Sequence, residues 1–121
     1  MSSPADLSAI EARLLIEAKA LSPVELAEAC IARVEAVDHA VNALVVRDFD
    51  RVFAAAQVAE RAVAKGEDLP LLHGLPFGGR EMLEVAGLPA TFGSAALAWD
   101  CAETGGHHGA RTKDRGAEQE R

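Results

Sequence analysis

The residues best suited to chemistry lie close together in residues 73–94, which read HGLPFGGREMLEVAGLPATFGS. Two adjacent opposite charges, Arg80 and Glu81, stand near the middle of this stretch. Arginine has a pKa above about 12 and stays protonated in proteins, so Arg80 can stabilise or bind an anion but cannot accept a proton. His73 could act as a general base, but we expect it to satisfy a backbone group instead. Ser94 could act as a nucleophile, but no base is visible near it.

Residues 74–81 (GLPFGGRE) nearly fit the phosphate-binding loop G-x-x-x-x-G-K-[ST], but two residues argue against nucleotide binding. Pro76 lacks an N–H donor, and Glu81 places a negative charge where a hydroxyl should meet magnesium. Three potential metal ligands occur near the C-terminus: Cys101, His107 and His108. Their spacing lacks the paired ligands of structural zinc sites. We therefore expect neither a cofactor nor a metal.

Three helices are predicted ahead of this stretch. The first begins at Asp6 or Ser8, and its apolar residues at helical spacing are Leu7, Ile10, Leu14 and Leu15. The second has Ser22 as its N-cap, with Pro23 at the first helical position and Glu25 completing a capping box. The apolar face of this second helix is predicted to contain Leu26, Ala27, Cys30, Ile31, Val34 and Val37. Cys30 is therefore expected to be a small hydrophobe rather than a nucleophile.

The third helix is predicted over residues 51–65, beginning after Asp48 or Asp50 and ending at Gly66. Residues 42–47 (NALVVR) are predicted to be a strand, and residues 75–80 a second extended segment. After Leu97 the chain contains no Leu, Ile, Val, Phe or Met. Such a segment buries too little apolar surface to offset the entropy of ordering, so we expect residues 98–121 to be disordered.

Composition narrows the function classes. The 121 residues carry a net charge of −7 and no basic stripe, which argues against nucleic-acid binding. No apolar run reaches 18 residues, so no membrane span is expected. The first 15 residues lack the basic and apolar regions of a secretory signal, which favours the cytoplasm.

Five segments, in order, resemble the amidase signature family. The most specific is residues 72–77 (LHGLPF), which is similar to the family pattern H-G-[IL]-P-x-x-[VIL]-K-D. The other four are residues 21–26, 33–43, 59–66 and 86–94. Each segment alone is a weak signal, but five in the correct order and spacing are a strong one.

The resemblance implies a single α/β domain, a mixed sheet covered by helices, within a longer chain. Residues 1–97 would form its N-terminal portion, mainly helical with one or two short strands, and residues 98–121 a polar tail. Family members hydrolyse or transfer carboxamide C–N bonds of small amides with a Ser–Ser–Lys triad. Arg80 stands at the position of the triad lysine, and Glu81 at that of the following aspartate. Both family serines would come later in the chain.

We therefore expect no amide turnover from this chain alone. A change of reading frame near residue 99 is one hypothesis for the loss of aliphatic residues, and a truncated product without selected activity is an alternative. Another is a helical interaction module, which would self-associate through two apolar stripes: Leu7/Ile10/Leu14 and Leu26/Cys30/Val34. The sequence identifies neither the substrate nor whether a free amidase or a tRNA-dependent amidotransferase subunit is involved.

Overall fold

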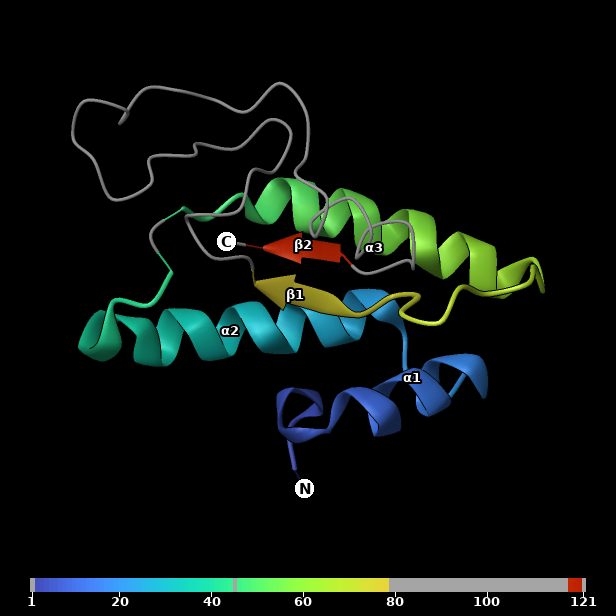
Figure 1. The fold of residues 1–121 in the computed structure, drawn as a ribbon, viewed down its shortest axis with the longest axis horizontal. Coiled ribbons are helices and arrows are strands. Elements are labelled where there is room, and N and C mark those ends of the chain that lie inside the picture. The colour runs from blue at the N-terminus through green and yellow to red at the C-terminus, as the bar shows by residue number, and fades with distance from the viewer. Residues whose placement is uncertain (1, 45, 79–117, 121) are drawn as a thin grey trace.

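The computed structural model describes residues 2–44, 46–78 and 118–120, and this part of the chain is mainly helical (Figure 1). A 3-10 turn, η1 (Pro4–Asp6), precedes three α-helices, α1 (Ala9–Glu17), α2 (Pro23–Val41) and α3 (Phe49–Ala64). Two short strands, β1 (Pro76–Gly78) and β2 (Glu118–Glu120), pair in parallel. The prediction of three N-terminal helices with one or two short strands is therefore confirmed.

Each helix begins at a side chain that satisfies its first N–H groups. The Ser8 hydroxyl accepts from the N–H of Glu11 at 3.2 Å, and the Glu11 carboxylate accepts from the N–H of Ser8 at 2.9 Å. Ser22 and Glu25 form the same reciprocal capping box at the start of α2. Asp48 caps α3. These caps are local: the Ser22 cap of α2 is confirmed, and Ser8 and Asp48 are each one of the two caps that the sequence allowed for α1 and α3.

The helices end at residues with a positive φ angle. Gly66 follows α3 at φ +71°, and the N–H groups of Gly66 and Glu67 bond back to the last turn of the helix at 3.1 and 3.3 Å. This is the Schellman motif, in which glycine is favoured because it has no Cβ. Lys19 ends α1 in the same geometry at φ +58°, and Asn42 ends α2 at φ +50°.

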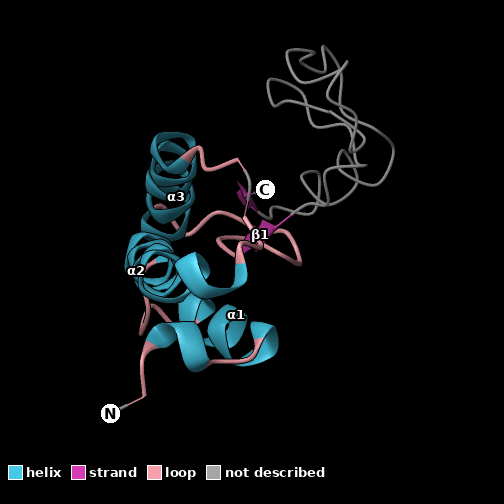
Figure 2. Ribbon diagram, turned by 90° about the vertical axis from the view of Figure 1, so that its left-hand side faces the viewer, coloured by secondary structure: helices cyan, strands magenta, loops and turns pink. Residues whose placement is uncertain are grey.

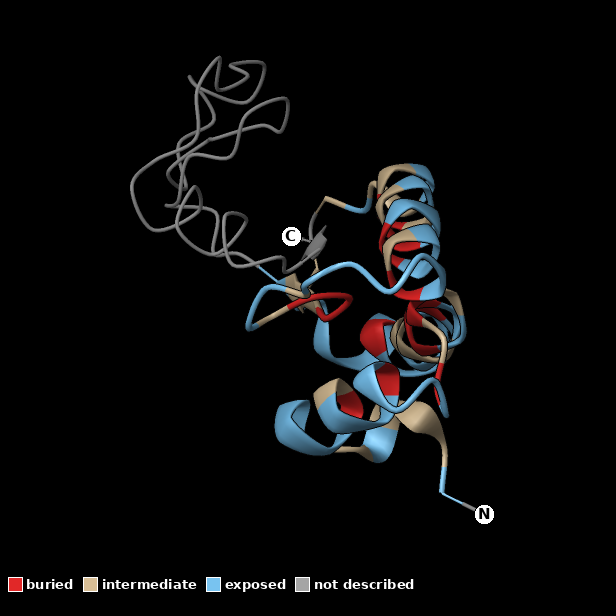
Figure 3. Ribbon diagram, turned by 90° about the vertical axis from the view of Figure 1, so that its right-hand side faces the viewer, coloured by how far each residue is buried: buried red, intermediate tan, exposed pale blue. Residues whose placement is uncertain are grey.

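The core lies where the helices face one another. Helices α2 and α3 run side by side in opposite directions, and α1 lies across one end of α2 (Figure 1). Seen from the side, the helices form one layer, with β1 against one face of it (Figure 2). One cluster of buried residues joins α1, the ends of α2 and α3 and the chain before β1: Ala12, Ile16, Leu21, Leu26, Val63 and Leu75. A second lies between α2 and α3: Ala27, Ile31, Val52 and Ala56 (Figure 3).

The buried face of α1 differs from the predicted one. The side chains of Ile10 and Leu14 are 74% and 60% exposed, while Ala12 and Ile16 are buried. Helical spacing identifies an apolar stripe but not what covers it. Arg13, next to the buried face, donates to backbone carbonyls of residues 69 and 70, which ties this side of α1 to the rest of the fold.

The predicted strand over residues 42–47 is wrong, because residues 42–44 and 46–47 are irregular. The N–H groups of Ala43 and Leu44 donate to the Asp38 carboxylate at 2.7 and 3.2 Å. Asp38 is itself buried on α2. The sequence predicts Val37 on the buried face of this helix instead, but Val37 is exposed. A side chain thus satisfies the backbone groups that a neighbouring strand would otherwise bond.

Of the segment predicted to be disordered, 98–121, only residues 118–120 are described, and they form β2. No helix in the described ranges is long and apolar enough to cross a membrane.

Candidate functional site

Residues 69–75, the turn segment, carry the chain from α3 to β1 and toward Arg80. The N–H of His73 donates to the carbonyl of Pro70 at 3.1 Å, and the N–H of Leu75 donates to the carbonyl of Leu72 at 3.2 Å. The extended geometry predicted for residues 75–80 is observed at 76–78, as β1. Arg80 follows Gly78, the last residue of β1, by two positions in the sequence.

His73 is held against α3. Its Nε2 lies 2.9 Å from the carbonyl oxygen of Ala59, and the residue is only 8% exposed. A carbonyl oxygen can only accept, so Nε2 carries the hydrogen and donates it. The prediction that His73 satisfies a backbone group is confirmed by this contact.

Gly74 lies where two helices meet the turn segment. Its φ is +74°, and a Cβ at this position would lie 3.0 Å from Cγ of Pro23 and 3.2 Å from Cδ1 of Ile16. Pro23 begins α2, and Ile16 lies in the last turn of α1. Glycine is therefore required twice here, for the left-handed backbone and for the close approach of the helices.

The start of the turn segment is bonded to α1 through Arg13. Its Nε and Nη2 donate to the carbonyl of Pro70 at 3.3 and 3.2 Å, and Nη1 pairs with the carboxylate of Glu17 at 3.2 Å. The Arg13 side chain is only 15% exposed. The guanidinium thus links α1 to backbone groups 56 or more residues later in the chain, a contact that no local pattern in the sequence indicates.

Asp38 is the centre of a second polar cluster, at the end of α2. It accepts from Arg47 as well as from the N–H groups of Ala43 and Leu44, and it is 4% exposed. Burial works to raise the pKa of Asp38, but hydrogen bonds from Arg47 and the two backbone N–H groups outweigh it and lower the pKa below its ordinary value. All its acceptor contacts are internal, so the cluster holds the loop after α2.

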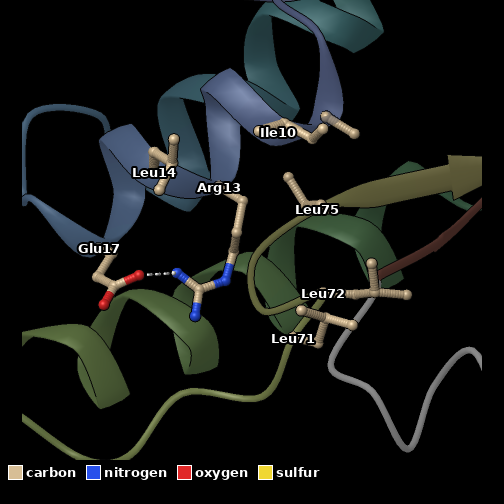
Figure 4. A pocket seen from close by; sticks show the side chains of 8 residues that line it. Ile10, Arg13, Leu14, Glu17, Leu71, Leu72 and Leu75 are labelled. Carbon is tan, nitrogen blue, oxygen red and sulfur yellow. Dashed lines mark hydrogen bonds and ion pairs between the residues drawn. The ribbon is translucent and has the colours of Figure 1, made fainter.

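A groove of about 400 Å³ lies between α1 and the turn segment (Figure 4). Its walls are mainly aliphatic, and the Arg13–Glu17 ion pair lies along one side (Figure 4). The residues lining it are Ala9, Ile10, Arg13, Leu14, Glu17, Leu71, Leu72 and Leu75. None of these side chains is a nucleophile. The groove is therefore suited to apolar contact rather than to catalysis.

Six other predicted site residues lie outside the described part of the chain: Arg80, Glu81, Ser94, Cys101, His107 and His108. No group of three or more metal-binding side chains occurs within the described residues. Cys30 is half-buried against the first cluster, in keeping with an apolar role. The phosphate-loop alternative fits poorly, because Pro76 to Gly78 form a strand rather than a loop.

Comparison with known proteins gives one consistent result. The family model described as Amidase matches residues 25–118, which include position 80. An acylamidase from Rhodococcus erythropolis is 42% identical over 92 residues, covering 76% of this chain and 19% of the relative. The A subunit of the glutamyl-tRNA(Gln) amidotransferase from Anaeromyxobacter sp. (strain K) is 38% identical over 101 residues, covering 80% and 20%.

Solved structures share the fold. A bacterial aryl acylamidase, described as belonging to the amidase signature enzymes, has a TM-score of 0.87 and 26% identity, covering 94% of this chain and 24% of its own. A fatty acid amide hydrolase has a TM-score of 0.91 at 22% identity, which shows the shared fold alone. The chain spans about a fifth of the length of the curated relatives it matches.

Proposed function

The chain belongs to the amidase signature family, and from that premise we propose that residues 1–97 serve as the N-terminal portion of a domain that hydrolyses or transfers carboxamide C–N bonds. The observation that carries the proposal is the family match across residues 25–118, which includes both the turn segment and position 80. The relatives are named as an acylamidase and as one chain of an amidotransferase, so a small carboxamide is the substrate class we propose. Location in the cytoplasm stays a prediction of the sequence.

Arg80 is proposed to stand in the place of the family's catalytic lysine. A buried lysine can lose its proton and act as a base, because burial lowers the pKa of an amine. A guanidinium does not lose its proton in proteins, so Arg80 can contribute only positive charge and hydrogen-bond donors. The 121 residues also contain no serine after Ser94. We infer that this chain by itself does not turn over amides.

The test is an assay of the purified full chain for release of ammonia or amine from simple aliphatic and aryl amides. We expect no turnover above the rate of a blank, and the same result for Arg80→Ala. Turnover that is present in the natural chain and lost in Arg80→Ala would contradict the inference, because the guanidinium would then take part in catalysis.

Self-association is a second candidate function, and one observation favours it. Ile10, Leu14 and Leu71 are 74%, 60% and 71% exposed, which leaves an apolar surface along the groove. The second stripe predicted for this role is used inside the fold instead. Leu26 is buried in the first cluster, and Cys30 packs against it. Of the two predicted stripes, the one on α1 is therefore the one left with exposed residues, Ile10 and Leu14.

Sedimentation velocity of the full chain tests this candidate. If α1 pairs between copies, the natural chain sediments as a dimer and Leu14→Gln as a monomer. Val58→Gln is the matched control, because Val58 is 58% exposed on α3 and lies outside the groove. A natural chain that is monomeric at all concentrations removes the candidate.

A further inference from the structure

We propose that the groove between α1 and the turn segment is a docking surface for the rest of an amidase signature domain, meaning the part of a relative that this chain does not match. The inference deepens the proposed function and rests on it, because it names what the N-terminal portion packs against. The surface lies wholly within the described residues.

Helix α1 has apolar residues on two opposite sides. Ala12 and Ile16 are buried in the first cluster, whereas Leu14 is exposed. Leu14 is two residues from each of them, and at about 3.6 residues per turn this separation points its side chain about 160° away from theirs. Ile10 lies one turn before Leu14, on the same side, and is also exposed. Because an amphipathic surface helix needs only one apolar side, α1 is suited to packing between two partners.

The turn segment continues this apolar surface across the groove (Figure 4). Leu71 is exposed, Leu72 is half-buried and Leu75 is buried. In the described ranges, every exposed leucine or isoleucine that is classed as a large apolar side chain lies in α1 or in the turn segment: Ile10, Leu14, Leu15 and Leu71. A contiguous apolar patch of this kind marks an interaction surface.

The charges beside the groove favour an uncharged partner. Arg13 is the only base among the described residues that line it. Its guanidinium already pairs with Glu17 and donates to the carbonyl of Pro70. The groove therefore offers no unpaired base of the kind with which a surface helix binds anionic lipid. An apolar protein surface is the occupant that fits.

The size of the groove favours the rest of a domain over a second copy of this chain. Helix α1 has nine residues and is about 14 Å long. Eight described residues line the groove, whereas a standard interface between two proteins uses about 20–30 residues a side. A contact of this size is small for a stable dimer, but it is ordinary for one part of the packing inside a large domain.

The relatives provide such a domain. This chain covers only 19% of the Rhodococcus erythropolis acylamidase and 24% of the solved aryl acylamidase. The superposition on the solved aryl acylamidase, with a TM-score of 0.87, covers 94% of this chain. The helical layer is therefore a minor part of a larger structure, most of which lies beyond the matched residues.

The test compares one substitution in two settings: the full chain, and a chimaera in which this chain replaces the matching segment of the Rhodococcus erythropolis acylamidase. In the chimaera, Leu14→Gln should lower the thermal unfolding midpoint by about 3–6 °C, because a leucine covered by the rest of the domain stabilises it through burial. In the full chain alone the shift should be below about 2 °C, since the side chain is exposed there. Val58→Gln is the matched control, exposed on α3 outside the groove, and should cause little change in either setting.

A folded chimaera whose midpoint does not change in Leu14→Gln overturns the proposal, because the groove then stays open in a complete domain. An equal fall in Val58→Gln also overturns it, because the groove is then not singled out. A midpoint of the natural full chain that rises with protein concentration, and no longer does so in Leu14→Gln, assigns the groove to a second copy and overturns the proposal as well.

A second measurement covers the case in which the chimaera does not fold. The full chain is co-expressed with a tagged acylamidase that lacks its matching segment, and the two should be recovered together. Leu14→Gln should reduce this recovery by at least about tenfold. Joint recovery that Leu14→Gln leaves unchanged overturns the docking role alone. If neither the chimaera nor the co-expressed pair yields folded protein, the proposed function fails and the docking role fails with it.

Discussion

Replacing Gly74 with alanine should separate the two reasons why glycine is needed in the turn segment. The left-handed backbone at φ +74° disfavours any residue with a Cβ. The added methyl would also lie 3.0 Å from Cγ of Pro23, closer than a comfortable contact. Pro23 cannot easily move, because it is buried at the capped start of α2. The strain must then fall on the turn segment itself.

Gly66 provides the matched control, since it has φ +71° but no atom within 4 Å of the position that an added methyl would take. For Gly66→Ala the left-handed backbone costs about 1–2 kcal/mol, and the stiffer unfolded chain returns about 0.4–1 kcal/mol. Gly74→Ala carries the same two effects plus overpacking, which typically costs about 1–3 kcal/mol. We therefore expect a loss of about 1 kcal/mol for Gly66→Ala and about 2–4 kcal/mol for Gly74→Ala.

Urea unfolding followed by circular dichroism measures both free energies of unfolding. A small domain is stable by only about 5–15 kcal/mol, so a loss of this size in Gly74→Ala should lower the urea midpoint clearly. If Gly74→Ala loses no more stability than Gly66→Ala, the close packing of Gly74 against Pro23 and Ile16 is refuted.

Further predictions concern the helix ends and the buried carboxylate of α2. Lys19→Gly should stabilise the protein by about 1 kcal/mol, because it removes the Cβ from a left-handed backbone position. Its thermal unfolding should show a higher midpoint. Asn42→Gly should change the midpoint little, since asparagine tolerates this backbone. The lowered pKa of Asp38 means that the folded state binds its proton less readily than the unfolded state. Its contribution to stability is therefore complete above about pH 3.9 and lost as the pH falls below that value. Asp38→Asn should accordingly unfold more easily than the natural protein near neutral pH, with the difference shrinking on acidification to about pH 3; a difference that stays constant would contradict the role of the carboxylate.

The sequence predicted what depends on neighbours along the chain. Ser22 and Glu25 are three residues apart, so the capping box could be predicted before any fold was known. Gly66 was predicted as a helix end for the same reason. The family, too, could be predicted, because the order of five short segments does not depend on packing.

Contacts between distant parts of the chain were missed. Helical spacing predicted α1, but the face it buries is the one covered by distant residues, among them Val63 and Leu75. The Arg13 hydrogen bonds to carbonyls more than 50 residues later were missed for the same reason. Residues 42–47 have β-branched side chains typical of a strand, yet the Asp38 carboxylate satisfies two of their N–H groups. The one available signal was an acid on the apolar side of α2 with Arg47 nine residues later.

The candidate site could be predicted in part. The sequence indicated residues 73–94, and the structure shows how His73 and Gly74 are fixed at the start of that stretch. The sequence did not indicate that Gly74 needs a left-handed backbone, because glycine occurs in many turns without one. The assignment of Arg80 to the lysine position stays a prediction.

That assignment is the central claim, and one kinetic ratio tests it most directly. The segment of the Rhodococcus erythropolis acylamidase that matches this chain would be replaced by the corresponding residues of this chain, once with Arg80 and once with Arg80→Lys. Loss of a general base costs about 10²–10⁴-fold in rate, so kcat/KM for an amide should be lower by at least about 100-fold with Arg80. Equal kcat/KM values in two folded chimaeras would contradict the claim.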